Sequence, residues 1–159
     1  MKILIQNGRV MDPASGRDEL ADIAIAAGRI IAVGKVAPDF HPNRTIDASG
    51  LVVAPGLVDL SVRLREPGQE HAGMLESEMA AAVAGGVTSL VCPPDTDPVL
   101  DEPGLVDMLK FRAEKLHQSR VFPLGALTRG LKGEVLTEMA ELTESGCIGF
   151  GQAEVPIVN

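Results

Sequence analysis

The chain has 159 residues, and its 14 basic against 22 acidic residues give a formal net charge of −8. Hydrophobic residues make up 45% and charged residues 23% of the sequence, a balance that excludes an intrinsically disordered chain. Duplex DNA is excluded as a ligand, because binding its phosphates takes clustered Lys and Arg side chains. No apolar run approaches the roughly 20 residues that cross a bilayer, and the first residues have no secretory pattern. We therefore expect a cytoplasmic protein with no membrane or nucleic-acid partner.

Cysteine and histidine residues give no metal-binding pattern. Cys92 and Cys147 are too few and too far apart for a disulfide framework or a Cys-x-x-Cys motif. Both are expected to be buried free thiols in a reducing compartment. His41, His71 and His117 lack the spacing of metal ligands and are expected to be solvated.

Residues 1–52 show the pattern of short strands and turns, with few helix formers. Asn7-Gly8 and Ala27-Gly28 are turn signals between apolar, β-branched segments. The expected strands are residues 2–6, 9–11, 22–26, 29–33, 45–47 and 51–53. The section is predicted to be all-β.

From residue 53 onward, apolar runs alternate with segments of helical periodicity. The expected strands are residues 56–64, 87–91, 121–127 and 147–150, and the expected helices are residues 74–83, 105–116 and 134–144. The first helix should end at Gly85-Gly86, and the second should have Pro103 in its first turn. The first strand, residues 56–64, is so continuously apolar that burial on both faces is expected. This order predicts parallel strands joined by right-handed helical crossovers.

Periodicity alone does not distinguish an open doubly wound sheet from a barrel. The first parallel strand is followed by neither G-x-G-x-x-G nor a P-loop, which disfavours a nucleotide-binding sheet. A (β/α)8 barrel normally needs about 250 residues, so four strands would make only half of one.

The most informative segment, residues 55–70, follows the first predicted parallel strand, where ligands bind in parallel α/β folds. Its "PGLVDL" and "LREPGQE" motifs, after a small β section, resemble the amidohydrolase superfamily and, within it, dihydroorotase. The similarity continues through "AAAVAGGVTSLVCPPDTDPVLD" and "LTRGLKGEVLTEMAELTESGCIGF", so it covers essentially the whole chain. It implies an α/β fold: the N-terminal part of a small β-sandwich domain over residues 1–52, then the first half of a (β/α)8 TIM barrel of amidohydrolase type over residues 53–159.

Two substitutions fall on positions where the family binds metal. In active dihydroorotases the first barrel strand ends in His-x-His, and both imidazoles bind a catalytic zinc; the resemblance places Ser61 and Arg63 there. A serine hydroxyl is a poor zinc ligand, and a guanidinium has no free lone pair. A unit charge about 4 Å from a divalent ion costs roughly 8 kcal/mol at an effective dielectric constant of about 20. The resemblance therefore implies that the zinc site is lost.

Further departures agree with this interpretation. The family pattern F-S-D-D-G, which contains a metal-binding aspartate, corresponds here to a segment in which Gln152 and Ala153 replace both carboxylates. Glu154 lies nearby and stays open as a shifted ligand. Asp95 replaces a substrate-contacting asparagine and would repel a dicarboxylate substrate. The family's remaining ligands are expected beyond residue 159.

Arg65 matches a family arginine that pairs with a substrate carboxylate, a task for which its fork geometry is suited. The alternative is that Arg65 neutralises Glu66 or another local acid. For Arg63 we expect a different role, in which its fixed positive charge replaces the metal and holds the surviving carboxylates at the mouth of the barrel.

The resemblance implies a catalytically inactive dihydroorotase-like subunit without zinc or another cofactor. Its implied role is a scaffold for the catalytic subunit of aspartate carbamoyltransferase in de novo pyrimidine biosynthesis, and a homo-oligomer is expected. Two alternatives stay open: an active metal-dependent dihydroorotase with rearranged ligands, and a non-catalytic binder of an anionic pyrimidine intermediate through Arg65.

The strands expected at residues 51–64 and 147–150 should have open edges, because strands from the far C-terminus complete the β section in the family. The chain is therefore either part of a longer polypeptide or covered by another chain. We favour the first, since Asn159 falls inside a motif.

Overall fold

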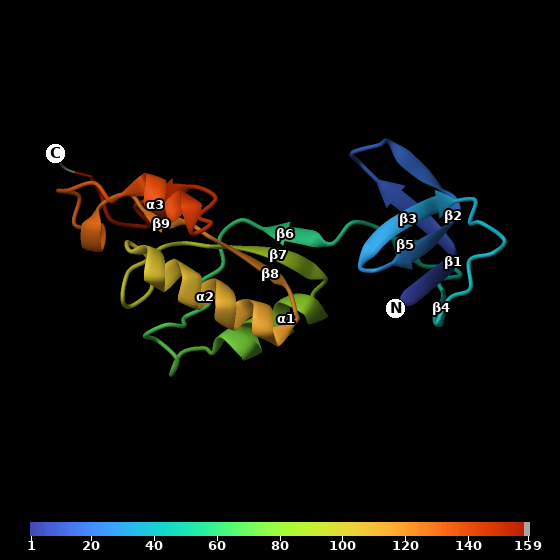
Figure 1. Ribbon diagram of the computed structural model, residues 1–159, viewed down its shortest axis with the longest axis horizontal. Coiled ribbons are helices and arrows are strands. Elements are labelled where there is room, and N and C mark those ends of the chain that lie inside the picture. The colour runs from blue at the N-terminus through green and yellow to red at the C-terminus, as the bar shows by residue number, and fades with distance from the viewer. Residues whose placement is uncertain (158–159) are drawn as a thin grey trace. The chain divides into compact units, whose positions relative to one another are not determined.

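The computed structural model describes residues 1–157, so the expectation about Asn159 lies outside the described residues. The chain divides into two compact units, Met1–Pro55 and a second unit that begins at Gly56 (Figure 1). Within the described residues, no helix is both long enough and apolar enough to span a membrane.

The first unit is a single five-stranded sheet. Its strands are β1 (Lys2–Asp12), β2 (Arg17–Ala26), β3 (Arg29–Gly34), β4 (Arg44–Asp47) and β5 (Val52–Val53). The order is β3-β2-β1-β4, and β5 also pairs with β1. The β1-β2 and β2-β3 pairs are antiparallel, whereas β4 and β5 run parallel to β1. A sandwich needs a second sheet, and residues 1–55 do not form one.

The predicted turn at Asn7-Gly8 is wrong. Strand β1 continues through these residues, and its pairing with β2 shifts register between Ile5 and Gly8. Asn7 has a φ of 62°, and its backbone N–H and side-chain amide donate to carboxylate oxygens of Asp22 and Asp47, respectively. The left-handed conformation that asparagine tolerates therefore forms a bulge rather than a hairpin turn.

The second unit is mixed α/β. Three parallel strands lie in the order β6-β7-β8, and the crossover helices α1 and α2 lie on one side of them (Figure 1). Their bounds are β6 (Leu57–Asp59), α1 (Leu75–Ala84), β7 (Val87–Cys92), α2 (Pro103–Leu116) and β8 (Arg120–Pro123). A smaller parallel pair follows, β9 (Gly125–Ala126) with β10 (Phe150–Gly151); between them come the 3-10 helix η1 (Arg129–Leu131) and α3 (Met139–Glu144). The described residues do not form a closed barrel.

The core of this unit lies between the two helices and β7. Its buried side chains are Leu64, Leu75, Met79, Leu90, Cys92, Leu100, Leu109 and Ala113. The predicted helix ends are confirmed: α1 stops before Gly85-Gly86, and α2 begins with Pro103 in its first turn. Both cysteines are buried and free, as predicted.

The strand predicted at residues 56–64 is wrong in length and in burial. Only Leu57–Asp59 forms β6, and the side chains of Leu57 and Val58 are about 60% exposed rather than buried on both faces. The physical reason is that β6 is an edge strand, paired with β7 alone among the described residues. The expected open edge is therefore present here, and Ile148 in the other expected open strand is also exposed.

The predictions for residues 121–127 and 134–144 are also partly wrong. The first segment is divided at Leu124 into β8 and β9, and the helix α3 begins only at Met139. Before α3 the backbone follows a loop, in which the Arg129 N–H donates to the Val135 carbonyl. Val135 and Leu136 are exposed, so the apolar periodicity that predicted a longer helix does not mark a buried face.

Candidate functional site

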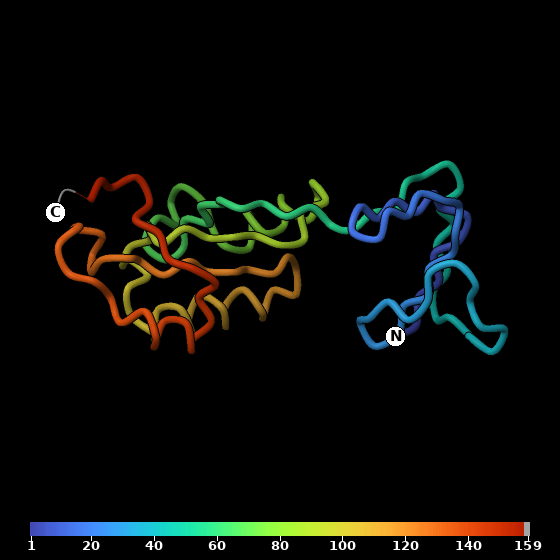
Figure 2. Tube along the Cα trace, turned by 90° about the horizontal axis from the view of Figure 1, so that it is seen from above, coloured from blue at the N-terminus to red at the C-terminus, as the bar shows by residue number. Residues whose placement is uncertain are grey.

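The predicted site residues follow the C-terminal ends of three strands of the second unit. The path of the chain between these strand ends can be followed in Figure 2. Ser61, Arg63 and Arg65 come after β6, Asp95 comes after β7, and Gln152–Glu154 comes after β10. This is the edge at which parallel α/β folds place ligands.

Arg63 is the residue that joins these strand ends. Its Nε donates to Asp95 Oδ2 at 2.6 Å, and its Nη2 donates to Glu154 Oε1 at 2.9 Å. The side chains of Arg63 and Asp95 are 32% and 27% exposed, whereas that of Glu154 is 84% exposed. The hydrogen bond that Arg63 donates to Asp95, together with the negative charges of Asp95 and Glu154, raises the pKa of Arg63 above its usual value. A permanently charged guanidinium therefore lies between two carboxylates.

Gln152 is held in a separate hydrogen-bonded network. The buried Thr128 hydroxyl accepts from the Gly133 N–H at 2.9 Å, so it donates its own proton to Gln152 Oε1, also at 2.9 Å. Gln152 Nε2 in turn donates to the carbonyl of Leu131 at 2.9 Å. Both ends of the carboxamide are thus used to hold the loop after β9 against the end of β10.

Ser61 and Ala153 are exposed and take no part in these networks. The backbone N–H of Ser61 donates to Asp59 Oδ1 at 3.0 Å. Ala153 has a φ of 51° and contributes only a methyl group. Within residues 1–157, neither residue is hydrogen-bonded to Arg63, so the structure does not bring all the substituted positions together.

Arg65 does not pair with Glu66, and that alternative is wrong. Glu66 Oε1 accepts from Arg112 at 2.8 Å, and its Oε2 accepts from the Leu75 N–H at the start of α1 at 3.0 Å. Arg65 instead donates to Gln69 Oε1 at 3.0 Å, and it forms no ion pair with another described residue. Its guanidinium therefore keeps donors that a ligand could use.

The groups at these strand ends do not fit a zinc site. Ser61 and Ala153 offer a hydroxyl and a methyl group, and the carboxamide of Gln152 is hydrogen-bonded at both its oxygen and its nitrogen. The nearby carboxylates of Asp95 and Glu154 are paired with the Arg63 guanidinium. The thiol of Cys92 is no substitute ligand, because burial raises its pKa to about 11 and keeps it protonated at neutral pH. The described part of the chain has no cluster of three or more His, Cys, Asp or Glu residues suited to a metal ion.

Sequence reasoning missed Thr128 and the pair between Glu66 and Arg112. Arg63 was expected to hold carboxylates at this edge, and its pair with Asp95 agrees with that expectation, because opposite charges at the ends of adjacent parallel strands face the same edge. The role of Thr128 could not be predicted, since one partner of the network is a backbone carbonyl that any residue supplies.

The fold is similar to that of amidohydrolases. The structure matches the L-hydantoinase (dihydropyrimidinase) of Arthrobacter aurescens with a TM-score of 0.77 and 26% identity, over 93% of this chain and 32% of that one. A crystal structure of a D-hydantoinase matches with a TM-score of 0.62 at 21% identity and supports the fold alone. The second unit thus has the mixed α/β architecture of part of this fold.

The sequence narrows the family further. Residues 50–159 match the family model described as dihydro-orotase-like, and the chain belongs to this family. It is 51% identical over 150 residues to a dihydroorotase-like protein of Pseudomonas aeruginosa, covering 94% of this chain and 36% of that protein. It is 44% identical over 159 residues to a dihydroorotase of Geobacter metallireducens, covering 100% of this chain and 38% of that protein. The chain thus spans little more than a third of the length of these relatives.

Proposed function

We propose that the chain is the N-terminal part of a non-catalytic dihydroorotase-like subunit. In this proposal residues 1–52 begin a small β-sandwich domain, and residues 53–159 form the first half of a (β/α)8 barrel. The observation that carries the proposal is the guanidinium of Arg63, which lies between Asp95 and Glu154 where the resemblance implies a zinc-binding imidazole.

The chemistry of the strand ends supports the absence of turnover. Opening or closing a cyclic amide requires an activated water or a polarised carbonyl, which a metal centre supplies in this family. The residues at these positions do not fit that metal. Asp95 and Glu154 each accept a hydrogen bond from Arg63, which ties both candidate general bases to a cation.

The proposed role is structural. The subunit would form a homo-oligomer that holds the catalytic subunits of aspartate carbamoyltransferase together in de novo pyrimidine biosynthesis, in the cytoplasm and without zinc or another cofactor. Support for the partner comes from the resemblance alone. Support for the non-catalytic role comes from the side chains at the strand ends, which do not fit a zinc site.

Co-purification with metal analysis tests this proposal. The complete protein, tagged and isolated from its own cells, should retain aspartate carbamoyltransferase through size exclusion and should contain far less than one zinc per subunit. An active zinc-dependent dihydroorotase, processed in parallel, provides the positive control for metal retention. One zinc per subunit together with chelator-sensitive turnover would instead establish the alternative of an enzyme with rearranged ligands.

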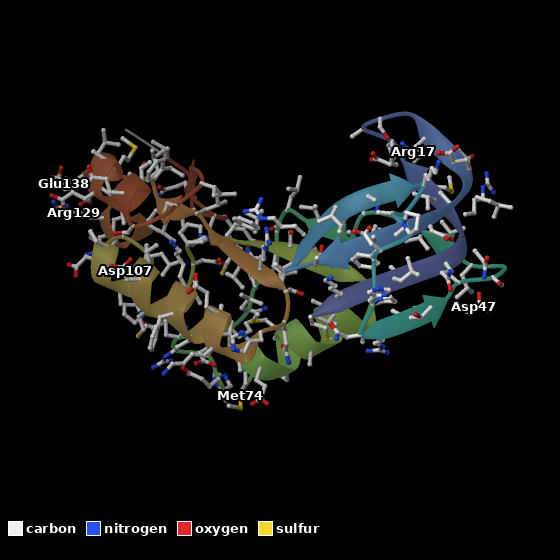
Figure 3. All side chains as sticks on the ribbon, turned by 45° about the vertical axis from the view of Figure 1, so that its right-hand side comes forward. Arg17, Asp47, Met74, Asp107, Arg129 and Glu138 are labelled. Atoms are coloured by element: carbon white, nitrogen blue, oxygen red, sulfur yellow. The ribbon has the colours of Figure 1, made fainter. Side chains whose placement is uncertain are left out.

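A second candidate function rests on Arg65, whose only hydrogen-bonded partner in the described residues is Gln69. Binding of an anionic pyrimidine such as dihydroorotate should then be saturable without turnover and should be lost in Arg65→Ala. Arg129→Ala is the matched control, because Arg129 is an exposed arginine whose partner is Glu138 (Figure 3). Equal binding by the two variants would eliminate this function.

A further inference from the structure

We infer that Arg63 and Gln152 form a two-point polar clamp that fixes the segment after β10 to the ends of the neighbouring strands. Arg63 holds Glu154 from the end of β6, and Gln152 is held by Thr128 and Leu131 from the loop after β9. The inference concerns how this chain stabilises its own strand ends. It is therefore independent of any carbamoyltransferase partner.

The way in which Arg63 uses its donors sets it apart from an ordinary surface ion pair. In the first unit, Arg9 directs its Nε and Nη2 to the two oxygens of one carboxylate, Asp18, at 2.6 and 2.7 Å. Arg63 divides the same two donors between Asp95 and Glu154. A bidentate pair joins two residues, whereas this arrangement joins three segments of the chain.

The segments that are joined lie far apart in the sequence. Asp95 is 32 residues and Glu154 is 91 residues from Arg63. Contacts of this kind close long loops, so they restrict segments that local structure leaves free. The clamp is completed by Gln152, because its carboxamide fixes the start of the segment that Glu154 holds at the other end.

The substituted residues thus have partners that their counterparts in a metal site could not have. A histidine at position 63 could not donate to two carboxylates through adjacent N–H groups of one planar fork. An aspartate at position 152 has no N–H to donate to the Leu131 carbonyl. Arg63 and Gln152, at positions that the resemblance assigns to metal binding, therefore join the strand ends through hydrogen bonds and an ionic interaction.

Amide hydrogen exchange in the complete protein tests the clamp. The probe is the N–H of Val155, which donates to the Gln152 carbonyl within the clamped segment. Arg63→Ala should accelerate its exchange by about 1.4- to 5-fold, the range expected for loss of a partly exposed ion pair. Arg63→Lys keeps the positive charge but lacks the planar guanidinium, so it should accelerate the exchange by an intermediate factor. It replaces Arg63→Ala as the test variant if the alanine variant does not fold. Arg9→Ala, the matched control in the first unit, should leave the exchange unchanged.

Double substitution shows whether Asp95 acts through Arg63. Asp95→Asn alone should accelerate exchange at Val155, and it should add nothing in the Arg63→Ala background. Treating the wild-type protein with a chelator should have no effect on this amide. The inference is overturned if Arg63→Ala changes exchange at Val155 no more than Arg9→Ala does. It is equally overturned if chelation alone reproduces the effect of Arg63→Ala, because a metal would then hold the segment.

Discussion

Replacing Gln152 by glutamate tests the hydrogen-bonded network with a change of almost no volume. The introduced carboxylate can still accept the proton of the Thr128 hydroxyl, which lies 2.9 Å from Gln152 Oε1. It cannot donate to the Leu131 carbonyl, which accepts from Gln152 Nε2 at 2.9 Å. A negative oxygen would instead face a carbonyl oxygen at hydrogen-bond distance.

The expected cost follows from the burial of the partners. Thr128 and Leu131 are 3% and 6% exposed, so water does not readily replace the lost donor. Leaving a buried acceptor unsatisfied costs about 1–3 kcal/mol, and we expect about 2 kcal/mol for Gln152→Glu at neutral pH.

The cost should depend on pH with a definite sign. The neutral carboxyl group can donate to the Leu131 carbonyl, so folding raises the pKa of the introduced group above the ordinary glutamate value of about 4.3. A raised folded-state pKa gives stability that is present below the unfolded-state pKa and is lost as the pH rises through the folded-state pKa. The difference between variant and wild type should therefore shrink to within about 0.5 kcal/mol near pH 4.

Urea unfolding of the complete protein at the two pH values measures this difference. The matched control is Gln118→Glu, since Gln118 is exposed and should tolerate the change at both values. The reasoning is refuted if Gln152→Glu costs no more than Gln118→Glu, or if its cost is the same at both pH values.

Four further predictions concern other parts of the second unit. The Cys92 thiol, whose pKa burial raises to about 11, should react with a thiol reagent at pH 8 only as fast as the protein opens; rapid labelling under native conditions would contradict its burial. Glu66→Ala should lower the unfolding free energy by about 1 kcal/mol, because it removes the acceptor for the first amide of α1; an unchanged urea midpoint would argue against that role. Gly68→Ala should destabilise by at least about 2 kcal/mol, since Gly68 has a φ of 98° and an added Cβ would lie 2.0 Å from the Asp97 carbonyl oxygen. In contrast, Gly104→Ala in the open first turn of α2 should stabilise by about 0.5 kcal/mol, and the two thermal midpoints should move in opposite directions.

The fold could be predicted where local chemistry and tertiary packing agree. Helix α2 begins where Pro103 was expected, because a proline lacks only an N–H that the first turn leaves unpaired. Predictions failed where packing decides. Residues 134–138 have helical apolar spacing but form a loop, in which the Val135 carbonyl accepts from the Arg129 N–H. Asn7-Gly8 forms a bulge, because Asp22 and Asp47 accept hydrogen bonds from the backbone and side-chain N–H groups of Asn7.

The site could be predicted only at its substituted positions. The unsuitability of Ser61 and Arg63 for zinc follows from the side chains themselves. The contact between Arg63 and Glu154 could not be derived, because it joins residues 91 apart across a β10 strand that is only two residues long. The predicted pairing of Arg65 with Glu66 is wrong for a similar reason. Glu66 accepts instead from Arg112 on α2, which is 46 residues away in the sequence.

The central claim is that these strand ends no longer support zinc-dependent catalysis. Its most direct test is the interconversion of dihydroorotate and carbamoyl aspartate by the purified complete protein, supplied with zinc and compared with a no-protein control. The account predicts no rate above that control, with or without added metal. Zinc-dependent turnover that a chelator abolishes would contradict it.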